Sequence, residues 1–541
     1  MNKLLSFLGK KTCSIILGIY LGIVVSIHLF MLLPSGFFSS FSTKIGFLII
    51  ILATFVISFF ISDFIIRRLR KICVKITPRQ SITHKKHYKV FLIFLAVSLA
   101  ISLVWFVAYA PGGFSPDSIG QYNQALTNNY SDWHPVLHTL IFFKIPMFIF
   151  NNNASAIVIC QIILFCIVVS YSLTTIYEIA GKKWGIVASL IILANPMVMD
   201  ELMSPWKDVA FAIFALFATT AALKIYASSG TWGNKNSRII LLAIVLSCAT
   251  IFRHNAILFT LPSIVGLFFF LKRTQWIKLV FLMLAVIFLI KVPLYSVLHV
   301  SSPDRRTSET AGISLTIIGN TIKKTPNLLD EEIINFAHNI TSQENWEKKY
   351  TTGDFNSIKW QSNLSRVEDA GVFKTTELAI RAITQSPSAG LGGLFGATQV
   401  VYGLEQNDNN YTVIPSVTKN DFSINYSGNQ FIKTFTDLYR NAFNDSILHY
   451  FSLVGTTIII ILAFILSHTQ WKKNNWKKIL LCLPILFYDF GTMILLSGPE
   501  TRFFYINFLV YPIIVIFSIL HHGNNHQSRN KKGKTKQVPH P

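Results

Sequence analysis

Apolar segments of 18 or more residues recur along almost the whole chain, which has 541 residues. A helix of this length crosses the hydrocarbon core of a bilayer, where only helices and closed barrels satisfy every backbone polar group. Hydrophobic residues make up 52% and charged residues 13% of the sequence, whereas charged residues are roughly 25% of a soluble protein. The chain is therefore predicted to be an all-α polytopic membrane protein.

Hydropathy predicts about twelve transmembrane helices. The first, residues 12–33, is too long for the apolar core of a signal peptide, so we expect it to be retained. Residues 136–150 are apolar but short, and Lys144 and Pro146 interrupt them, so we expect a helix that lies along the membrane surface. The predicted parts of the chain are N-terminal spans with a basic loop (1–110), a polar loop with the surface helix (111–153), a transmembrane core (154–291), a mostly helical cap (292–446), C-terminal spans (447–521) and a basic tail (522–541).

The net charge of +23 is unevenly distributed. Residues 67–89 contain nine Lys or Arg and no acidic residue, and residues 523–541 contain five, again without an acid; residues 292–444 contain 13 Lys or Arg and 15 Asp or Glu. Basic residues confined to alternate loops are the positive-inside pattern of membrane proteins. We therefore expect a multi-pass protein of the cell membrane with both termini in the cytoplasm and the cap outside. The basic loops would face the lipid bilayer, and no nucleic-acid partner is expected.

The polar loop after the third predicted span, Phe114–His138, concentrates side chains that can carry chemistry. Asp117, Asp132 and His134 lie in it, close to the end of an apolar helix. A carboxylate just outside a bilayer can act as a general base on a hydroxyl or hold a divalent cation, and an imidazole can add a ligand or a hydrogen bond. The alternative for Asp117 is that it caps the helix that begins near Ser118.

Two further motifs interrupt apolar runs on the same predicted side of the membrane. Lys207 and Asp208 follow one predicted span and begin the next, so they are either a helix start or part of an outer cavity. Arg253, His254 and Asn255 place positive charge on an outer turn, where the topology disfavours it. A charge beside the hydrocarbon is a functional hypothesis, and a snorkelling arginine is the alternative.

A fourth motif, GPETRFFY, contains Glu500 and Arg502 between two very apolar runs. The planar guanidinium group of arginine binds phosphate oxygens in pairs, and a neighbouring carboxylate can orient it. A simple surface ion pair is the alternative. All four motifs emerge on one predicted side of the membrane, which favours one composite site.

The order of these motifs resembles the GT-C class of integral-membrane glycosyltransferases, which includes protein O-mannosyltransferases and the aminoarabinose transferases of lipid A. In that class an acidic motif in the first large outer loop precedes an interfacial helix, as Asp117 in SPDSIGQY precedes HPVLHTLIFFKIPMFIF. Three later elements of the class also have similar counterparts in this chain. The segment NPMVMDELMSPWKDVAFAIF, with Asp208, resembles the element that opens a later span, and RHNAILFTLP resembles a basic turn before a Pro-containing span. The segment ETRFFY resembles a late acid-x-Arg-aromatic motif.

The N-terminal half also resembles a family of Gram-positive membrane proteins with TPDS, DWHP and KD motifs. The chain departs from the GT-C pattern in two respects. It has two additional N-terminal spans, and it has a single aspartate in the first motif where many members of the class have an acidic pair.

The resemblance implies a glycosyltransferase that moves a sugar from a polyprenyl-phosphate-linked donor to a cell-envelope glycan, lipid or protein on the outer face of the membrane, with inversion at the anomeric carbon. Asp117 would be the general base, and Arg253 and Arg502 would hold the carrier phosphate. Three catalytic-site residues would shape the sugar site or, together with Asp117, hold a divalent cation as the possible cofactor: Asp132, His134 and Asp208. The remaining polar residues of the motifs would line the substrate site: Lys207, His254, Asn255 and Glu500.

Two other classes of function remain open from the sequence. A transporter or flippase of a lipid-linked sugar would need charged residues near the middle of the membrane and internal repeats, and neither is evident. A non-catalytic membrane sensor whose outer domain binds a ligand is the second alternative, because fold resemblance alone does not establish catalysis.

Overall fold

The computed structural model describes residues 2–33, 37, 40–72, 87–302, 306–405, 414–468 and 476–520. Residues 73–86 of the predicted basic loop and the whole predicted basic tail, 522–541, therefore lie outside the described residues. The described part is built from helices, with three isolated β-bridges and no named strand. The prediction of an all-α protein is confirmed.

Among the described residues, seven helices are long and apolar enough to cross a membrane, and a pair of helices bent by 59°, Lys182–Leu193 and Pro196–Leu202, makes up to eight. The seven are Lys11–Met31, Phe41–Lys71, Tyr88–Tyr109, Ala154–Ala180, Lys207–Ala227, Arg273–Val297 and Thr501–Ile519. Shorter apolar helices occupy three of the other predicted spans and the predicted surface helix: Asn236–Phe252, His254–Phe268, Val454–His468 and Val136–Ile149. The chain thus has helices suited to a membrane, and the number twelve stays a prediction.

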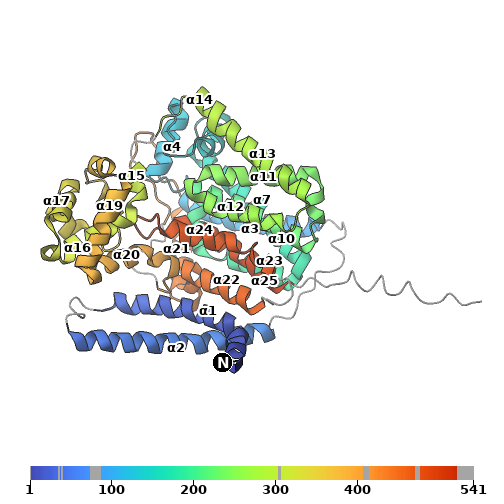
Figure 1. Ribbon diagram of the computed structural model, residues 1–541. Helices are drawn as coiled ribbons and strands as arrows, with labels where there is room; N and C mark the ends of the chain where they lie inside the picture. Colours follow the sequence, from blue (N-terminus) through green and yellow to red (C-terminus); the bar gives the residue numbers. More distant parts are fainter. Residues whose placement is uncertain are drawn as a thin grey trace, which may run out of the picture.

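Figure 1 shows these helices running back and forth through one bundle. The helices of the first half are α1 (Asn2–Met31), α2 (Phe41–Ile72), α3 (Tyr88–Tyr109), α4 (Pro116–Thr127), α7 (Ala154–Ala180), α8 (Lys182–Leu193), α9 (Pro196–Leu202), α10 (Lys207–Ala227) and α11 (Asn236–Phe252). Those of the second half are α12 (Ile257–Phe268), α13 (Arg273–Leu289), α14 (Tyr295–Val297), α15 (Arg306–Thr310), α16 (Gly312–Lys324), α17 (Glu331–Ile340), α18 (Asn356–Lys359), α19 (Ser365–Gln385), α20 (Pro387–Tyr402), α21 (Gln430–Asn444), α22 (Val454–His468), α23 (Trp476–Ile479), α24 (Leu483–Met493) and α25 (Tyr505–Ile519).

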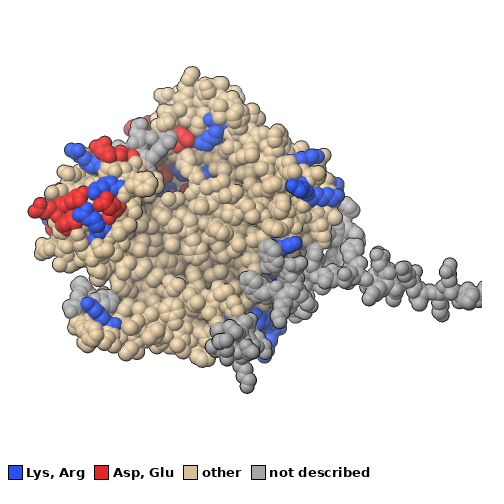
Figure 2. Space-filling model, in the orientation of Figure 1, with Lys and Arg blue, Asp and Glu red and all other residues tan. Residues whose placement is uncertain are grey.

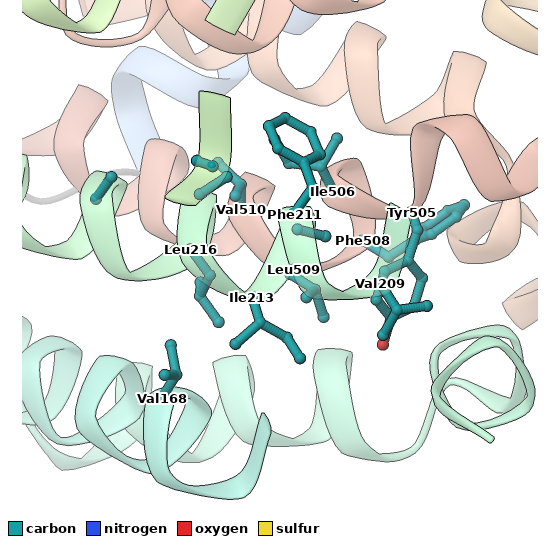
Figure 3. Close-up of a cluster of buried hydrophobic side chains, with 14 of the residues drawn as sticks. Val168, Val209, Phe211, Ile213, Leu216, Tyr505, Ile506, Phe508, Leu509 and Val510 are labelled. Atoms are coloured by element: carbon teal, nitrogen blue, oxygen red, sulfur yellow. The ribbon is translucent and has the colours of Figure 1, made fainter. Parts of the chain in front are cut away.

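The centre of the bundle is formed by α7, α10 and α25. Nearly every residue of α10 and α25 is buried, as expected of helices that are apolar on all sides. Figure 3 shows Phe211 and Ile213 of α10 beside Phe508 and Leu509 of α25, with Val168 of α7 facing them. The first residues of α10 and the turn before α25 are consequently held at fixed positions, and both carry predicted site residues.

The α1–α2 hairpin packs on the edge of the bundle, along the lower side of Figure 1. Gly18 and Gly22 of α1 allow close approach, because a Cβ atom on Gly18 would lie 2.9 Å from the Cα atom of Phe59. Small residues four apart are a common contact between membrane helices. The opposite side of α2 exposes large apolar side chains such as Phe60, which suits a surface that faces lipid.

A second hydrophobic core lies in a lobe formed by α15 to α19 and the start of α20, at the left of Figure 1. Trp346, Tyr350 and Phe355 are buried at its centre. This lobe corresponds to the first part of the predicted cap. The last part of that predicted segment behaves differently, because α21 packs against α3 at the end of the bundle.

Charged side chains are unevenly distributed over the surface. Figure 2 shows acidic and basic side chains together on the lobe, basic side chains at the opposite end, and a broad surface without charge between them. An uncharged belt between two polar ends is the arrangement that a bilayer requires. It agrees with a membrane-embedded protein.

A buried ion-pair network fixes α21 to the bundle. The guanidinium group of Arg440 contacts both carboxylate oxygens of Asp200 on α9 at 2.7 Å, and it also reaches Asp437 and the hydroxyl of Tyr109, each at 2.6 Å. Trp105 donates a further hydrogen bond to Asp200 at 2.9 Å. Asp200 is completely buried, so its charge depends on these partners.

We expect Arg440→Met to lower the free energy of unfolding by roughly 3–5 kcal/mol, because it leaves the Asp200 carboxylate buried without a counter-charge. The double variant Arg440→Met with Asp200→Leu should recover much of this loss. Thermal unfolding in detergent, followed by size-exclusion chromatography, measures both effects.

A matched control is Arg381→Met, which removes an arginine that contacts three carboxylates on a more exposed surface of the lobe. Its effect should stay near 1 kcal/mol or less. Equal losses in the two single variants would show that burial of the Arg440 network adds nothing to stability.

Candidate functional site

Asp117 lies in the first turn of α4, where Pro116 starts the helix and Ser115 is the N-cap residue. The Asp117 carboxylate makes no capping hydrogen bond; it accepts one from the Nη1 atom of Arg502 at 2.8 Å. The alternative that Asp117 serves as a helix cap is therefore not what the structure shows. Ser115 is held in turn by the indole nitrogen of Trp206, which donates to its hydroxyl at 2.9 Å.

Arg502 occupies the turn just before α25 and joins two carboxylates. Its Nε atom donates to Glu500 at 2.5 Å, while Nη1 binds Asp117. The guanidinium carbon lies 5.1 Å from the ring centroids of both Trp206 and Phe503. The Arg502 side chain is only 19% exposed, so this is a built cluster and not the surface ion pair considered from the sequence.

The charges around Asp117 decide its protonation. Burial by itself would raise the pKa of the Asp117 carboxyl, but the Arg502 guanidinium outweighs it and holds the pKa well below its usual range. Asp117 is thus ionised at any physiological pH. Its side chain still keeps 33% of its surface accessible, so a substrate can reach it.

His134 is buried, and burial lowers its pKa to about 3, with the nearby Lys207 acting in the same direction. The imidazole is therefore neutral at physiological pH. Its Nδ1 atom has no hydrogen-bond partner among the described residues. His138, in contrast, lies with its Nδ1 atom 2.7 Å from the Oε1 atom of Gln121 and stacks on Phe142, so it serves packing.

Lys207 and Asp208 are the first two residues of α10, directly after Trp206. Asp208 forms a buried ion pair with Arg253, and the Nε atom of Arg253 donates to Asn255 at 2.5 Å. Arg253 is 7% exposed, so the snorkelling alternative does not apply. Lys207 donates to the carbonyl of Trp133 at 3.4 Å and has no carboxylate within ion-pair distance among the described residues.

Asp132 is directed away from this cluster. Its carboxylate binds Lys291 at 3.0 Å and the hydroxyl of Tyr295 at 2.7 Å, and its carbonyl oxygen lies 3.2 Å from the Nε2 atom of His254. These contacts tie the polar loop to the end of α13 and to the turn before α12. Asp132 and His254 therefore flank the Asp117 cluster and position its loop.

The four motifs predicted from the sequence thus meet at one end of the bundle. The electrostatic neighbours of Lys207 include Asp117, Arg253 and Arg502, which come from the three other motifs. Figure 2 shows acidic and basic side chains in a hollow between the lobe and the top of the bundle. A shared, partly accessible cluster is the arrangement a polar substrate requires.

The arrangement does not fit the possible divalent cation. Among the described residues no group of three His, Cys, Asp or Glu side chains could hold a metal ion. Arg502 binds Asp117, Lys291 binds Asp132, and the buried His134 makes no hydrogen bond or ion pair with a carboxylate oxygen of the described residues. We derive no chemical step through a metal, and the cation stays a prediction.

Sequence reasoning missed the contribution of the lobe. The backbone nitrogen of Phe355 donates to Ser497 at 2.8 Å, and the amide of Asn356 donates to Glu500 at 2.8 Å. Asp354 lies so close that a Cβ atom on Gly498 would clash with its carboxylate. The Asp354–Asn356 segment carries no motif in the sequence, and only the packing of the lobe brings it to Glu500.

Glu201 belongs to the same polar segment between two predicted spans as Lys207 and Asp208, and the sequence includes it in that motif. Glu201 of α9 is 1% exposed, and neither of its carboxylate oxygens has a hydrogen-bond partner among the described residues. Its nearest charged neighbours include Arg502 and Glu500. The sequence predicts Asp200 and Glu201 as polar residues of this motif, but it does not show that the two carboxylates face different partners.

Comparison of the chain with protein-family models, with curated proteins and with solved structures found no match in any of the three.

The stability of the protein is expected to depend on pH through Asp354, which lies where the lobe meets the site. Burial raises the pKa of Asp354 to about 6, and the neighbouring Glu500 acts in the same direction. A carboxyl whose pKa is higher in the folded protein binds more protons there than in the unfolded chain, so stability falls as pH rises from 3.8 to about 6. Asp354→Asn should therefore raise the unfolding temperature at pH 7 and raise it about half as much at pH 5.

The shift corresponds to about 3 kcal/mol, at roughly 1.4 kcal/mol for each pKa unit. Asp369→Asn, at an exposed position of α19, is the control and should have the same small effect at both pH values. A pH-independent effect of Asp354→Asn would show that this carboxyl does not titrate in the interval.

Proposed function

We propose that the chain is a membrane glycosyltransferase, which takes a sugar from a polyprenyl-phosphate carrier and passes it to a hydroxyl of a cell-envelope acceptor. The observation that carries the proposal is the Asp117 cluster: an ionised, accessible carboxylate held by Arg502, beside the unpaired cation Lys207. This cluster combines a proton acceptor with an anion site. The proposal has no support from relatives and rests on this geometry and on the order of the motifs.

A lipid-borne donor fits the position of the cluster. Lys207 and Arg502 stand at the very start of two apolar helices that are long enough to cross a membrane, Lys207–Ala227 and Thr501–Ile519. The site therefore lies at the level where an apolar belt gives way to polar groups. The phosphate of a polyprenyl carrier occupies this level, because its chain stays in the hydrocarbon and its charge stays in water.

The cations have different roles in this proposal. Arg253 and Arg502 are already neutralised by Asp208, and by Asp117 and Glu500, in buried or half-buried pairs. Lys207 has no such partner within the part of the chain that the structure describes, so we assign the first contact with the carrier phosphate to Lys207. Arg502 then orients Asp117 and keeps it ionised, and Arg253 holds the start of α10 in place.

Transfer proceeds by displacement at the anomeric carbon. Asp117 accepts the proton of the acceptor hydroxyl, whose oxygen forms the new bond to the sugar. The bond between the anomeric carbon and the carrier oxygen breaks, and its electron pair leaves with the carrier phosphate beside Lys207. Attack from the side opposite the leaving group inverts the anomeric configuration.

A transporter of the same lipid-linked sugar is the second candidate. The supporting observation is Asp489 of α24, which is completely buried within the bundle and accepts a hydrogen bond from Asn507 of α25 at 2.6 Å. Polar pairs at such depth line the paths of transporters. A sensor function has no comparable observation in its favour.

The decisive experiment combines deletion with a point variant. In a deletion strain that carries Asp117→Asn, the lipid-linked sugar should accumulate on the outer face, because Asn keeps the shape of the side chain and cannot accept the proton. Turnover of reconstituted protein should fall about 10²–10⁴-fold. Periodate, which does not cross membranes, oxidises sugar diols on the outer face only and so reports the side of accumulation.

Asp369→Asn is the matched control and should transfer like the wild type. Accumulation on the inner face would identify the transporter, and normal transfer by Asp117→Asn would remove Asp117 from the mechanism. Since the pKa of Asp117 lies well below its usual range, wild-type turnover should show no loss from this group between pH 8 and pH 5.

Variants of Lys207 and Arg502 should affect different kinetic constants. Lys207→Gln removes the unpaired cation and should raise the KM for the lipid donor ten- to a hundredfold, which corresponds to roughly 1.5–3 kcal/mol for a charge-assisted contact. Arg502→Lys keeps the charge but loses one of two directed hydrogen bonds, so it should mainly lower kcat. The reverse pattern would assign the phosphate to Arg502.

A further inference from the structure

Helix α21 turns its charged face toward the protein and its apolar face outward, the reverse of a helix on a water-exposed surface. Its charged residues face the bundle: Arg440 binds Asp200 of α9, and Tyr109 of α3 donates to Asp437 at 2.6 Å and has Lys433 over its ring. Its outer face carries three large apolar side chains, Phe431, Phe435 and Leu438, which are 83%, 64% and 63% exposed.

These three side chains form one stripe. Positions i, i+4 and i+7 of an α-helix lie on the same side, so Phe431, Phe435 and Leu438 are adjacent on the surface. Charged residues of α21 are absent from this stripe. In water such an arrangement would be unfavourable, since it hides the charges and leaves the aromatic rings uncovered.

The position of α21 indicates what covers the stripe. The segment before it closes over the end of α3, where the nitrogens of Ser427 and Asn429 donate to the carbonyls of Ala110 and Val107, each at 2.8 Å. Farther along, the hydroxyl of Tyr439 donates to the carbonyl of Ala194, at the end of α8, at 2.5 Å. The helix thus crosses the ends of neighbouring spans.

The stripe continues onto surfaces that belong in the bilayer. On α3, Val104 and Val107 are 40% exposed near the start of α21. After α21, Ile447 and Leu448 expose apolar side chains before α22 begins. Apolar side chains are therefore exposed on α3, on α21 and just before α22; of the two charged residues between Leu438 and Ile447, Arg440 is buried and Asp445 is exposed.

We propose that α21 is a membrane-interface helix whose apolar face lies among the acyl chains of bilayer lipids. The Arg440–Asp200 ion pair sets its depth, because it ties the polar face of α21 to α9. The last part of the predicted cap is then in contact with lipid, and only the lobe before it is surrounded by water. This inference does not depend on the proposed enzymatic function.

The inference also places the candidate site relative to the membrane. Asp200, which binds Arg440, is followed directly by Glu201, whose charged neighbours include Arg502 and Glu500. Helix α21 is therefore connected to the candidate site through two adjacent residues of α9: Asp200 binds α21, and Glu201 lies near the site. The site is held at the membrane–water boundary by a contact that is independent of any substrate.

Spin-label accessibility tests the proposal. Nitroxide labels are placed singly on Phe435→Cys and Leu438→Cys of the full chain, with the native cysteines replaced, and the protein is reconstituted in phosphatidylcholine vesicles. Molecular oxygen concentrates in lipid, and a neutral nickel complex stays in water. The oxygen-to-nickel collision ratio should be severalfold higher at residues 435 and 438 than at a control on the lobe.

Phe373→Cys on α19 is that control, since Phe373 is 94% exposed among charged residues, and Val104→Cys on α3 is the control for lipid contact. Ratios at 435 and 438 equal to that at 373 would overturn the proposal. Labels that neither reagent reaches would also overturn it, because they would indicate that a protein partner covers the stripe. Spin–spin broadening that disappears when unlabelled protein is added would overturn it as well, because it would indicate that a second copy of the chain covers the stripe. If one variant fails to fold on size-exclusion chromatography, Phe431→Cys replaces it on the same stripe.

Discussion

A charged side chain inside an apolar bundle is stable only where it meets an opposite charge, a hydrogen-bond partner or water. This constraint decides how the helix ends of the protein meet. Arg502 stands at the start of an almost completely buried helix and is satisfied by Asp117 and Glu500. Arg253 is satisfied by Asp208 in the same way. Without these pairs the first polar loop, the start of α10 and the turn before α25 would have no reason to converge.

The groups that the constraint leaves unsatisfied are the informative ones. Lys207 has no carboxylate partner, His134 has an unpaired ring nitrogen, and Glu201 has two unpaired oxygens, within the part of the chain that the structure describes. Buried polar groups without partners are unfavourable in a resting protein. They are favourable where a polar substrate supplies the missing partner, which is why the proposed donor site is centred on Lys207.

The lobe and α21 act on this cluster from two sides. From the lobe, Asn356 orients Glu500, which in turn holds Arg502. From the bundle, Arg440 of α21 fixes Asp200 beside Glu201. A cluster supported by two separately packed elements keeps its geometry while its accessible side stays open. For the same reason, the geometry of the cluster depends on residues that do not contact a substrate, such as Asp354 and Arg440.

The sequence by itself determined the helical class, the presence of apolar helices suited to a membrane and the four polar motifs, because hydropathy and helix-terminal residues act locally. It also indicated that the motifs share one side of the membrane, since alternation of basic loops is a property of the chain order. Only the tertiary structure decided the partners. Asp117 meets Arg502 across 385 positions, and Asp200 meets Arg440 across 240, because helix packing chooses which ends are neighbours. The reversed faces of α21 and the diversion of Asp132 to Lys291 have the same origin: a side chain's partner depends on which helices pack together, and no local pattern records that.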